Sequence, residues 1–432
     1  MKNKKTVYVP LGADIIHSGH INIIENAKKY GKVIIGLFSD EAISEYKRVP
    51  YVSYEDRYNI LKNFKGVSKI MKHNNWDYTE NLRSIRPDYF IHGDDWKKGI
   101  QKTKRAQVIN LLKKWNGKLI EIPYTKKPII SENHRSINSI YFSSASRVSR
   151  LKKILNYKKF VRIVECHHPL IGMLIENLNF NKKNESVEFD GLWSSSLTES
   201  AVMGKRDDGS LDLNTRISNL NNVLNVTSKP IIFDADNGGR EEHLPQLIHN
   251  MERLGISCIV MEDKTGTKIN SLFENQKKAT QDSISNFCNK IKIVKKASKY
   301  SDFLVAARIE SLILKKGMKD ALKRAENYSK AGADLILIHS KSKKPQEILD
   351  FAKKFKKSKH FRPLIAVPSS YSVIKEEKLR KAGFSMVIYA NQLLRASVIT
   401  VENVLKSILK NSRSYEIEKK IMPIKEILNI IP

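Results

Sequence analysis

An apolar strand-like run followed by a helix-like run occurs eight times between residues 161 and 412, and this alternation limits the fold more than any other feature. Eight such units over roughly 250 residues are typical of a (β/α)8 barrel. Residues 316–331 show the clear 3.6-residue apolar period of a helix. The expected strands are residues 161–166, 189–194, 230–234, 256–262, 303–308, 334–339, 363–367 and 384–389.

Polar side chains stand at the expected carboxyl ends of seven of these eight strands. A barrel of this kind carries its chemistry on that face, because the loops that follow the strands gather there. The fold by itself therefore predicts a functional site. Its polar groups are Trp193 to Ser196, Asp234, Asp236, Glu262 to Lys264, Arg308, Glu310, His339, Ser340, Ser369, Ser370 and Asn391, with Arg395 just beyond.

Three acids on adjacent expected strands, Asp234, Asp236 and Glu262, indicate the chemistry of this face. Carboxylates in this arrangement collect a hard cation such as Mg²⁺, and salt bridges at the barrel mouth are the alternative. Arg308 and His339 would supply hydrogen-bond donors to carboxylate and phosphoryl oxygens.

The segment after the fourth expected strand is a suitable lid for an anionic substrate, since it carries lysine, asparagine and serine side chains. It reads Glu-Asp-Lys, five residues, Asn-Ser over residues 262–271. This pattern resembles the gating loop of phosphoenolpyruvate mutase, in the isocitrate lyase superfamily, and the resemblance covers about residues 160–412. Phosphonopyruvate hydrolase is the nearest alternative within the superfamily, and the lid pattern favours the mutase.

The mutase resemblance implies Mg²⁺-dependent interconversion of phosphoenolpyruvate and phosphonopyruvate, in which a phosphoryl group moves from the enol oxygen to C3 inside a closed, dry site. It also implies a role for each matching residue. Asp207, Lys268 and Asn270 would be catalytic, Trp193, Ser195, Ser271, Arg308 and His339 would bind substrate, and Asp234 would ligate Mg²⁺ directly, with Asp207, Asp236 and Glu262 acting through waters.

The first part of the chain also alternates strand-like and helix-like runs. This pattern predicts a doubly wound, Rossmann-like parallel sheet, whose ligands bind at the carboxyl ends of its strands. The expected strands are residues 6–10, 32–38, 67–71, 88–92 and 118–122, and the expected helices lie near 20–30, 53–64, 78–86 and 101–115.

Two histidines, His17 and His20, flank a Ser-Gly turn after the first expected strand and open a helix. Both rings and the helix N-terminus can face one phosphate, as an in-line nucleotidyl transfer requires. The spacing of the two histidines is by itself only weak evidence for nucleotidyl transfer. Further motifs follow it at Ser39-Asp40, Lys47-Arg48, residues 54–57 and residues 92–96.

This series resembles the cytidylyltransferases that make CDP-glycerol and CDP-ethanolamine, across about the first 125 residues. The resemblance implies CTP as co-substrate. It implies that His17 and His20 stabilise the α-phosphate in the transition state, and that the nucleotide site also includes Asp14, Lys47, Arg48, Arg57, Gly93, Asp94 and Asp95.

Two departures from the cytidylyltransferase pattern leave an alternative open. Leu11-Gly-Ala-Asp14 stands where the family has Gly-x-Phe-Asp, and Ile130-Ser-Glu132 stands where it ends in Ile-Ser-Thr. Glu132 would repel a triphosphate. The first part of the chain is therefore either a nucleotidyltransferase or a nucleotide-binding module without catalysis.

The composition excludes other classes of function. The formal net charge is +32, but the lysines are spread along the whole chain, so we expect small anionic substrates and no nucleic acid. No apolar stretch approaches the roughly 20 residues of a membrane span. The N-terminus leads straight into a strand-like run, and we expect a cytoplasmic protein.

The expected organisation has four parts: a cytidylyltransferase-like domain over 1–125, a linker over 126–160, the barrel over 161–412 and a helical tail over 413–432. Helix-like segments at about 391–410 and 415–430 would permit a homo-tetramer, as is common among barrels that this one resembles. We expect a bifunctional enzyme of phosphonate biosynthesis, with CTP-dependent cytidylyl transfer to a phosphonate or phosphate. The alternative is a phosphonopyruvate hydrolase joined to a non-catalytic nucleotide-binding module.

Overall fold

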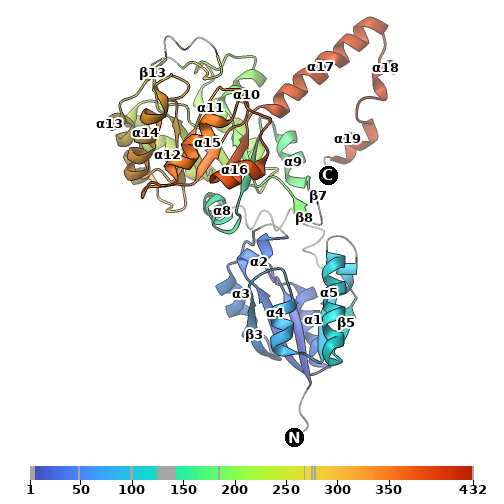
Figure 1. Ribbon diagram of the computed structural model, residues 1–432. Helices are drawn as coiled ribbons and strands as arrows, with labels where there is room; N and C mark the ends of the chain where they lie inside the picture. The colour runs from blue at the N-terminus through green and yellow to red at the C-terminus, as the bar shows by residue number, and fades with distance from the viewer. Residues whose placement is uncertain are drawn as a thin grey trace.

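The computed structural model describes residues 5–46, 49–97, 101–123, 143–182, 185–266, 268–273, 276 and 279–430. The first part of the chain forms a five-stranded sheet, and the second part forms a closed eight-stranded barrel (Figure 1). The predicted fold class is confirmed. Within the described residues, no helix is both long and apolar enough to cross a membrane.

The first sheet is parallel, with the strand order β3-β2-β1-β4-β5. Buried apolar side chains pack on both of its faces, around Tyr8 and Phe90 on one and around Val9 and Ile35 on the other. Strand β1 lies between β2 and β4, so the winding of the chain reverses there, and such a reversal point is where open sheets bind ligands.

The strands of this sheet are β1 (Thr6–Leu11), β2 (Lys32–Phe38), β3 (Val67–His73), β4 (Tyr89–Gly93) and β5 (Lys118–Ile122). Its helices are α1 (Ser18–Lys28), α2 (Asp40–Ser44), α3 (Tyr54–Leu61), α4 (Thr79–Ile85) and α5 (Lys102–Leu112), with short 3-10 turns η1 (Asp94–Lys97) and η3 (Lys113–Trp115).

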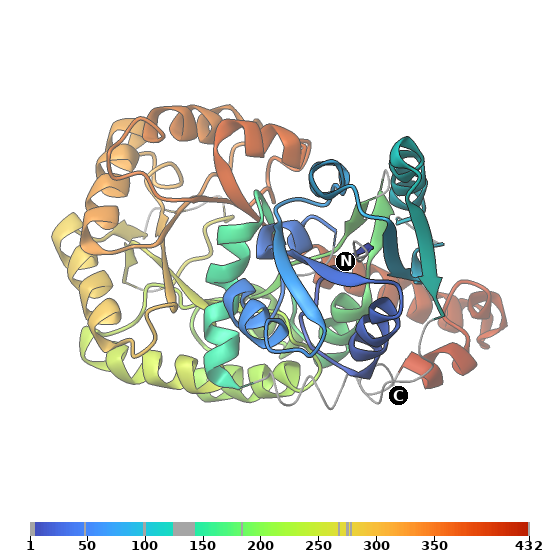
Figure 2. The ribbon, with the colours of Figure 1, turned by 90° about the horizontal axis from the view of Figure 1, so that it is seen from below.

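The barrel strands are parallel and follow one another in chain order until β17 closes onto β6. All eight predicted strands are present, and Figure 2 shows their helices as a ring around them. The strands are β6 (Val161–Glu165), β9 (Gly191–Ser194), β10 (Ile231–Asp234), β11 (Cys258–Glu262), β14 (Leu304–Ile309), β15 (Leu335–Ile338), β16 (Leu364–Ala366) and β17 (Phe384–Tyr389). The helices are α9 (Pro169–Asn177), α10 (Ser196–Val202), α11 (Leu213–Leu224), α12 (Leu244–Leu254) with the 3-10 turn η4 (Glu241–His243) before it, α13 (Ile284–Ala297), α14 (Gly317–Ala331), α15 (Gln346–Phe355), α16 (Glu376–Ala382) and α17 (Gln392–Asn411).

Helix α8 (Ser144–Tyr157) precedes β6 and closes the amino-terminal end of the barrel. Its Leu151 and Ile154 are buried in the same apolar cluster as the inward-facing strand residues. Val49, from the first part of the chain, is buried in that cluster too. The two parts of the chain are therefore joined by core packing at this end of the barrel.

Two short antiparallel pairs interrupt the strand–helix repeat, and the sequence does not predict them. They are β7 (Phe180–Lys182) with β8 (Glu185–Val187), and β12 (Lys264–Thr265) with β13 (Thr280–Gln281). Strands of two or three residues are too short to show a period. The β12–β13 pair closes the base of the segment that follows β11, and we call its described residues, 264–266, 268–273, 276 and 279–281, the lid.

Helix α17 projects away from the barrel in Figure 1, and none of its residues is buried. Val398, Leu405 and Leu409 are among the apolar side chains that it leaves exposed. This exposed face is compatible with assembly, and the predicted tetramer stays a prediction.

The helix-like segment expected over 415–430 is divided in the structure. The chain forms two short helices there, α18 (Tyr415–Glu418) and α19 (Ile424–Ile430). Pro423 lies between them, and a proline lacks the backbone N–H that a continuous helix would need at that position.

We expect Leu151→Ala to destabilise the barrel, because the fully buried side chain would leave a cavity in the plug formed by α8. The free energy of unfolding should fall by about 2–5 kcal/mol. Urea unfolding followed by circular dichroism measures it, and Asn156→Ala, an exposed position on the same helix, is the control. Equal midpoints for both variants would show that α8 is not part of the barrel core.

Candidate active site

Strand periodicity aims one group of polar side chains into the barrel mouth. Side chains alternate between the two faces of a strand, so residues two apart share a face. Ile232, Val260, Ala306 and Leu337 belong to the interior cluster. The residue two positions after each of these is, in the same order, Asp234, Glu262, Arg308 or His339. These four side chains line a common pocket.

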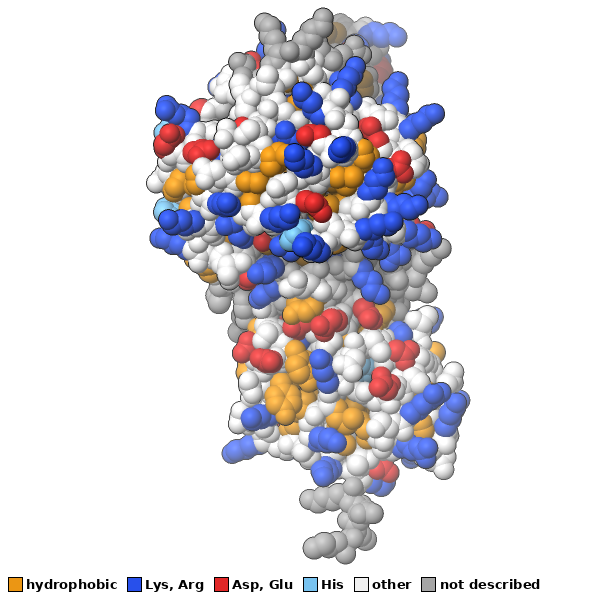
Figure 3. All heavy atoms as spheres, turned by 60° about the vertical axis from the view of Figure 1, so that its left-hand side comes forward, with side chains coloured by type: hydrophobic (Ala, Val, Ile, Leu, Met, Phe, Trp, Pro, Cys, Tyr) orange, Lys and Arg blue, Asp and Glu red, His pale blue; other side chains and the backbone are white. Residues whose placement is uncertain are grey.

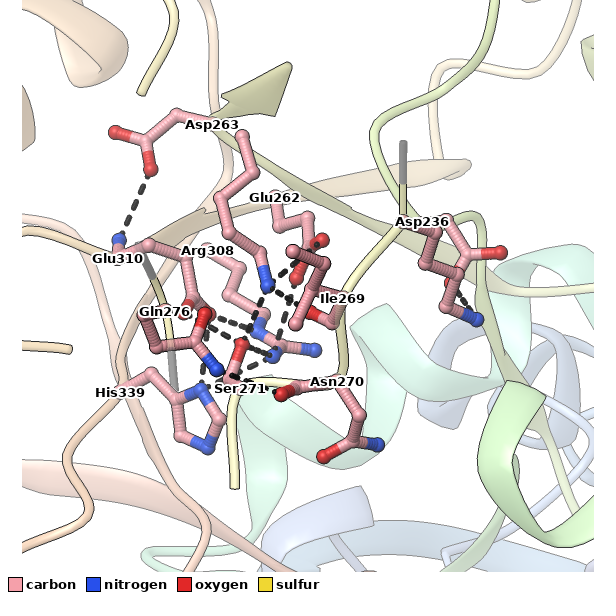
Figure 4. A network of polar contacts seen from close by, with 12 residues as sticks. Asp236, Glu262, Asp263, Ile269, Asn270, Ser271, Gln276, Arg308, Glu310 and His339 are labelled. Carbon is pink, nitrogen blue, oxygen red and sulfur yellow. Dashed lines mark hydrogen bonds and ion pairs between the residues drawn. The ribbon is translucent and has the colours of Figure 1, made fainter. Parts of the chain in front are cut away.

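A buried network of charged groups joins β11, β14 and β15 at this mouth (Figure 4). Arg308 Nε donates to Glu310 Oε1 at 2.5 Å, and its Nη2 lies 3.1 Å from Glu262 Oε2. His339 Nδ1 lies 2.8 Å from Glu310 Oε1. Burial acts to raise the pKa of Glu310, but the charges of Arg308 and His339 outweigh it and hold that pKa well below its usual range.

Glu310 stands among the polar groups predicted for this face without a role of its own, and it is fully buried at the centre of this network. It follows Arg308 by two positions, so the same periodicity that selects Arg308 selects Glu310. That signal was available in the sequence.

The lid is closed over the pocket. Asn270 Nδ2 donates to Asp207 Oδ2 at 2.6 Å, and Lys268 Nζ contacts Asp207 and lies 2.7 Å from Asp236 Oδ1. Ser271 Oγ donates to Glu310 Oε2 at 2.7 Å and accepts from Lys264 Nζ at 2.8 Å. The lid residues predicted to be catalytic are thereby brought onto the predicted catalytic aspartate.

Negative charge exceeds positive charge around this pocket. Arg216 adds no net charge because it is paired with Glu199, its Nε 2.6 Å from Glu199 Oε2. Of the other described groups, five carboxyl groups face three permanent cations, so the excess would be two negative charges with all five ionised. The carboxylates are Asp207, Asp234, Asp236, Glu262 and Glu310, and the cations are Lys264, Lys268 and Arg308.

Burial and the neighbouring carboxylates raise the pKa values of two of these acids. Burial, with Glu310 and Asp236 nearby, raises the pKa of Glu262 to about 8 despite Arg308. Burial and the neighbouring Asp234 raise the pKa of Asp236. Burial works in the same direction on Asp234, but Arg308 and Lys268 outweigh it and lower that pKa.

Asp263, the second acid of the lid motif, points away from the pocket because it follows Glu262 by one residue. Its Oδ2 lies 3.0 Å from Arg324 Nη1 and accepts from the Tyr328 hydroxyl at 2.7 Å, while its Oδ1 accepts from the Glu310 N–H at 2.9 Å. It therefore anchors the strand ends on which the network stands.

The remaining predicted barrel residues also lie in the pocket. Trp193 and Ser195 line it, and the Ser195 hydroxyl caps α10 by accepting from Thr198 N at 3.4 Å. Ser196 Oγ donates to Asp234 Oδ2 at 3.0 Å. The predicted substrate, lid and carboxylate residues of the barrel thus share one site.

A second pocket lies at the reversal point of the first sheet. His17 and His20 line it with ring centroids 4.0 Å apart, and Gly93 and Asp95 line it from β4 and η1. His17 is the N-cap of α1, where its Nδ1 accepts from Gly19 N at 3.1 Å. A Cβ on Gly19 would lie 2.8 Å from His17 Cε1, so a larger residue here would displace the His17 ring.

Two tyrosines that the sequence does not predict complete this pocket, together with His92 of the motif at residues 92–96. Tyr46 and Tyr78 line it, and the His92 ring stacks on Trp96 with centroids 4.0 Å apart. An aromatic wall suits a nucleobase. No spacing rule connects these residues, because they come from separate loops.

Two residues predicted to bind nucleotide serve the scaffold of the first sheet. Arg57 is completely buried, and its guanidinium donates to the Phe38 carbonyl at 2.9 Å and to Asp40 Oδ1 at 2.5 Å. Asp14 Oδ1 accepts from the Tyr51 N–H at 2.7 Å. The predicted nucleotide contact of Arg57 is therefore wrong, since protein groups occupy its donors, and Asp14 holds the loop that follows α2.

Three other residues predicted to bind the nucleotide are Lys47, Arg48 and Asp94. Lys47 and Arg48 lie outside the described residues. Asp94 begins the 3-10 turn η1, next to Asp95, which lines the pocket.

Comparison with known proteins identifies the barrel. Residues 151–409 match the family model for phosphoenolpyruvate phosphomutase. The chain belongs to this family. It is 34% identical to the phosphoenolpyruvate phosphomutase of Tetrahymena pyriformis over 291 residues, which are 67% of this chain and 93% of that relative. Membership makes the chain an enzyme of the superfamily that contains phosphoenolpyruvate mutase and isocitrate lyase.

The phosphomutase family also resembles hydrolases in structure. A solved structure of phosphonopyruvate hydrolase in complex with oxalate and Mg²⁺ is 30% identical to this chain, with a TM-score of 0.58, and the match covers 66% of this chain and 94% of that one. The barrel fold is thus shared between the two activities.

The first part of this phosphomutase-family chain carries a second domain type. Residues 13–164 match the cytidylyltransferase-like family model. The chain is 31% identical to glycerol-3-phosphate cytidylyltransferase of Bacillus subtilis over 86 residues, which are 19% of this chain and 67% of that relative.

The raised pKa of Glu262 predicts a pH dependence of stability in metal-free protein. An unfolded glutamate titrates near pH 4.3, and Glu262 in the fold titrates at about 8. The folded protein binds the extra proton, so stability is lost as the pH rises through this interval.

We expect Glu262→Gln to flatten this loss, as measured by urea unfolding in EDTA at about pH 5 and about pH 8. Asp282→Asn, at a buried acid outside the pocket, is the control and should keep the wild-type slope. Identical slopes in all three proteins would contradict a protonated Glu262.

Proposed function

We propose that the barrel interconverts phosphoenolpyruvate and phosphonopyruvate with Mg²⁺. The observation that carries this proposal is the closed lid, which sets Lys268 and Asn270 on Asp207 within a pocket that also holds Arg308 and His339. Such a pocket offers donors to an anionic substrate and keeps water from the reacting phosphoryl group.

The residues of this pocket fit a divalent cation. With all five carboxyl groups ionised, its excess of two negative charges would equal the charge of one Mg²⁺, and carboxylates are the ligands that this ion prefers. Among the described residues, no three acidic, histidine or cysteine side chains converge as a ready site. In the proposed arrangement Asp234 would hold Mg²⁺ directly, with Asp207, Asp236 and Glu262 acting through water. When bound, the ion would supply positive charge to phosphoryl and enolate oxygens.

The side chains themselves would bind, orient and enclose the reactants. Arg308 and His339 would donate to carboxylate and enolate oxygens. In the forward direction the enol C–O–P linkage breaks at its P–O bond, and the phosphorus forms a bond to C3 of the resulting pyruvate enolate. Asp207, fixed by Lys268 and Asn270, would orient the migrating phosphoryl group.

A hydrolase differs only in whether water reaches that phosphoryl group. The lid bears on this choice: Ser271 is buried, and it is held by both Lys264 and Glu310. A lid tied down at its tip favours phosphoryl migration over hydrolysis. Hydrolysis is the second candidate, since the hydrolase shares the fold and a similar level of identity.

For the first sheet we infer CTP-dependent cytidylyl transfer to a phosphonate or phosphate. The paired rings of His17 and His20 at the N-terminus of α1 support it, because they offer donors to an α-phosphate. A nucleotide-binding module without catalysis is the alternative. Both activities on one chain would suit phosphonate biosynthesis, in which a phosphonate made from phosphonopyruvate receives a CMP group.

The first test is ³¹P NMR of the full-length protein with Mg²⁺ and phosphonopyruvate. We expect the phosphonopyruvate signal to convert to that of phosphoenolpyruvate, and Asp207→Ala to slow this by about 10²–10³-fold or more. Asp208→Ala, at the exposed neighbouring acid, is the control and should leave the rate unchanged. Release of inorganic phosphate would instead make the barrel a hydrolase.

The second test adds CTP and 2-aminoethylphosphonate to the same protein. We expect pyrophosphate and a CMP ester, and a loss of about 10²–10³-fold in His20→Ala, because one donor to the developing charge is removed. Asp207→Ala should keep this activity, since Asp207 belongs to the other pocket. Binding of CTP without pyrophosphate release would support the non-catalytic module.

A further inference from the structure

A second hollow opens at the barrel mouth, outside the closed lid, and we call it the vestibule. It is distinct from the inner pocket but shares a wall with it: Leu197 and Leu272 line both. Leu272 is part of the lid, so the lid separates the two spaces. The polar residues that line the vestibule include Lys315, Lys341, Lys343, Ser370, Asn391 and Arg395.

Cationic side chains dominate the vestibule, and they come from three different strand–helix connections. Lys315 follows β14, Lys341 and Lys343 follow β15, and Arg395 lies in the first turn of α17. Within the described part of the chain, no ion pair within 4.0 Å neutralises any of the four. Like charges gathered without counter-charge repel one another, so an anion bound among them would stabilise the arrangement.

The fold holds these cations in place by groups beneath them. The fully buried Glu165 accepts from the Leu394 N–H at 2.7 Å and so fixes the turn that carries Arg395. The Ser342 N–H donates to Ser340 Oγ at 3.0 Å, which shapes the loop between Lys341 and Lys343. Hydrogen bonds therefore fix the backbone next to these cations.

Asn391 gives a second, independent sign of a ligand. Its side chain lines both the vestibule and the inner pocket and is only 6% exposed. Its Oδ1 is buried and has no hydrogen-bond partner among the described residues, and its Nδ2 makes one long contact of 3.4 Å to Ser369 Oγ. A buried amide left unsatisfied costs about 1–3 kcal/mol, which a polar ligand at this wall would offset.

We propose that the vestibule is a second anion-binding site, which takes the phosphoryl or phosphonyl head of a small molecule while the lid is closed over the inner pocket. The lysines and Arg395 hold the charged oxygens, the Ser370 hydroxyl and Asn391 Nδ2 donate uncharged hydrogen bonds, and Asn391 Oδ1 accepts from a protonated oxygen of the head group. This inference does not depend on which reaction the inner pocket performs, because binding outside the lid requires no turnover.

The general lysine content of the chain does not by itself explain this site. Figure 3 shows Lys and Arg side chains scattered over the visible face with acidic side chains between them. The vestibule differs because its cations converge on one hollow around an unsatisfied amide. Exposed lysines elsewhere therefore provide a control with the same change in net charge.

Titration calorimetry of the full-length protein with inorganic phosphate, and separately with methylphosphonate, in Mg²⁺-free buffer tests the affinity. We expect the triple variant Lys315→Gln, Lys341→Gln, Lys343→Gln to bind either probe at least about tenfold more weakly, which corresponds to about 1.4 kcal/mol. The control triple variant Lys353→Gln, Lys354→Gln, Lys357→Gln should stay within about twofold of wild type. Equal weakening in both triple variants would reduce the effect to net charge and overturn the proposal.

Lysine acetylation read by mass spectrometry locates the anion. We expect phosphate to protect Lys341 and Lys343 from acetylation and to leave Lys353 and Lys354 unprotected. Protection of Lys264 and Lys268 alone would mean that phosphate binds only in the inner pocket, and uniform protection would mean only general screening. Either of these results would overturn the proposal, whatever the enzyme catalyses.

Discussion

The buried ion pair between Arg308 and Glu310 is the interaction on which the rest of the active site depends. Arg308 also reaches Glu262 and His339, and Glu310 also receives the hydroxyl of Ser271. The Arg308–Glu310 pair at the end of β14 thus connects the ends of its two neighbouring strands, β11 and β15, and the lid. Removal of either partner would leave the other buried charge with its main counter-charge missing, which is far more costly than the loss of an exposed salt bridge.

This pair does not balance the charge of the pocket, and the imbalance links the lid to the chemistry. Lys268 brings its ammonium between Asp207 and Asp236 when the lid is closed. Lys268 offsets one of the carboxylates in this way, and the remaining negative charge can be balanced by a divalent cation or, without the cation, by protons such as that on Glu262. Closure of the lid, charge balance and exclusion of water are therefore one coupled event in the proposed mechanism.

The barrel pocket opens at the end of the barrel opposite to the one that packs against the first part of the chain. Val49 from the first part of the chain packs with Leu151 and Ile154 at the amino-terminal end of the barrel, whereas the active site lies at the carboxyl ends of the strands. A product of the barrel would have to leave through the mouth before it reached the first sheet. This separation agrees with a reaction sequence in which other steps lie between phosphonopyruvate and the cytidylyl acceptor. Because the vestibule lies at the barrel mouth, an anion released from the active site would enter the vestibule first.

Much of the fold and of the barrel site follows from the sequence by itself. The periods of apolar residues predict all eight barrel strands and the five strands of the first sheet, because a strand buried on both faces needs a continuous apolar run. The same logic places Asp234, Glu262, Arg308 and His339 at one face, since the ends of parallel strands meet there. Glu310 was within reach of this reasoning.

The tertiary structure decided what periodicity does not encode. It turned Asp263 outwards to Arg324, buried Arg57 among backbone carbonyls, and assembled Tyr46, Tyr78 and His92 into one wall. It also inserted Val49 into the base of the barrel. Sequence patterns report local spacing along one strand or helix. Contacts between distant loops depend on how whole elements pack, and no local period carries that information.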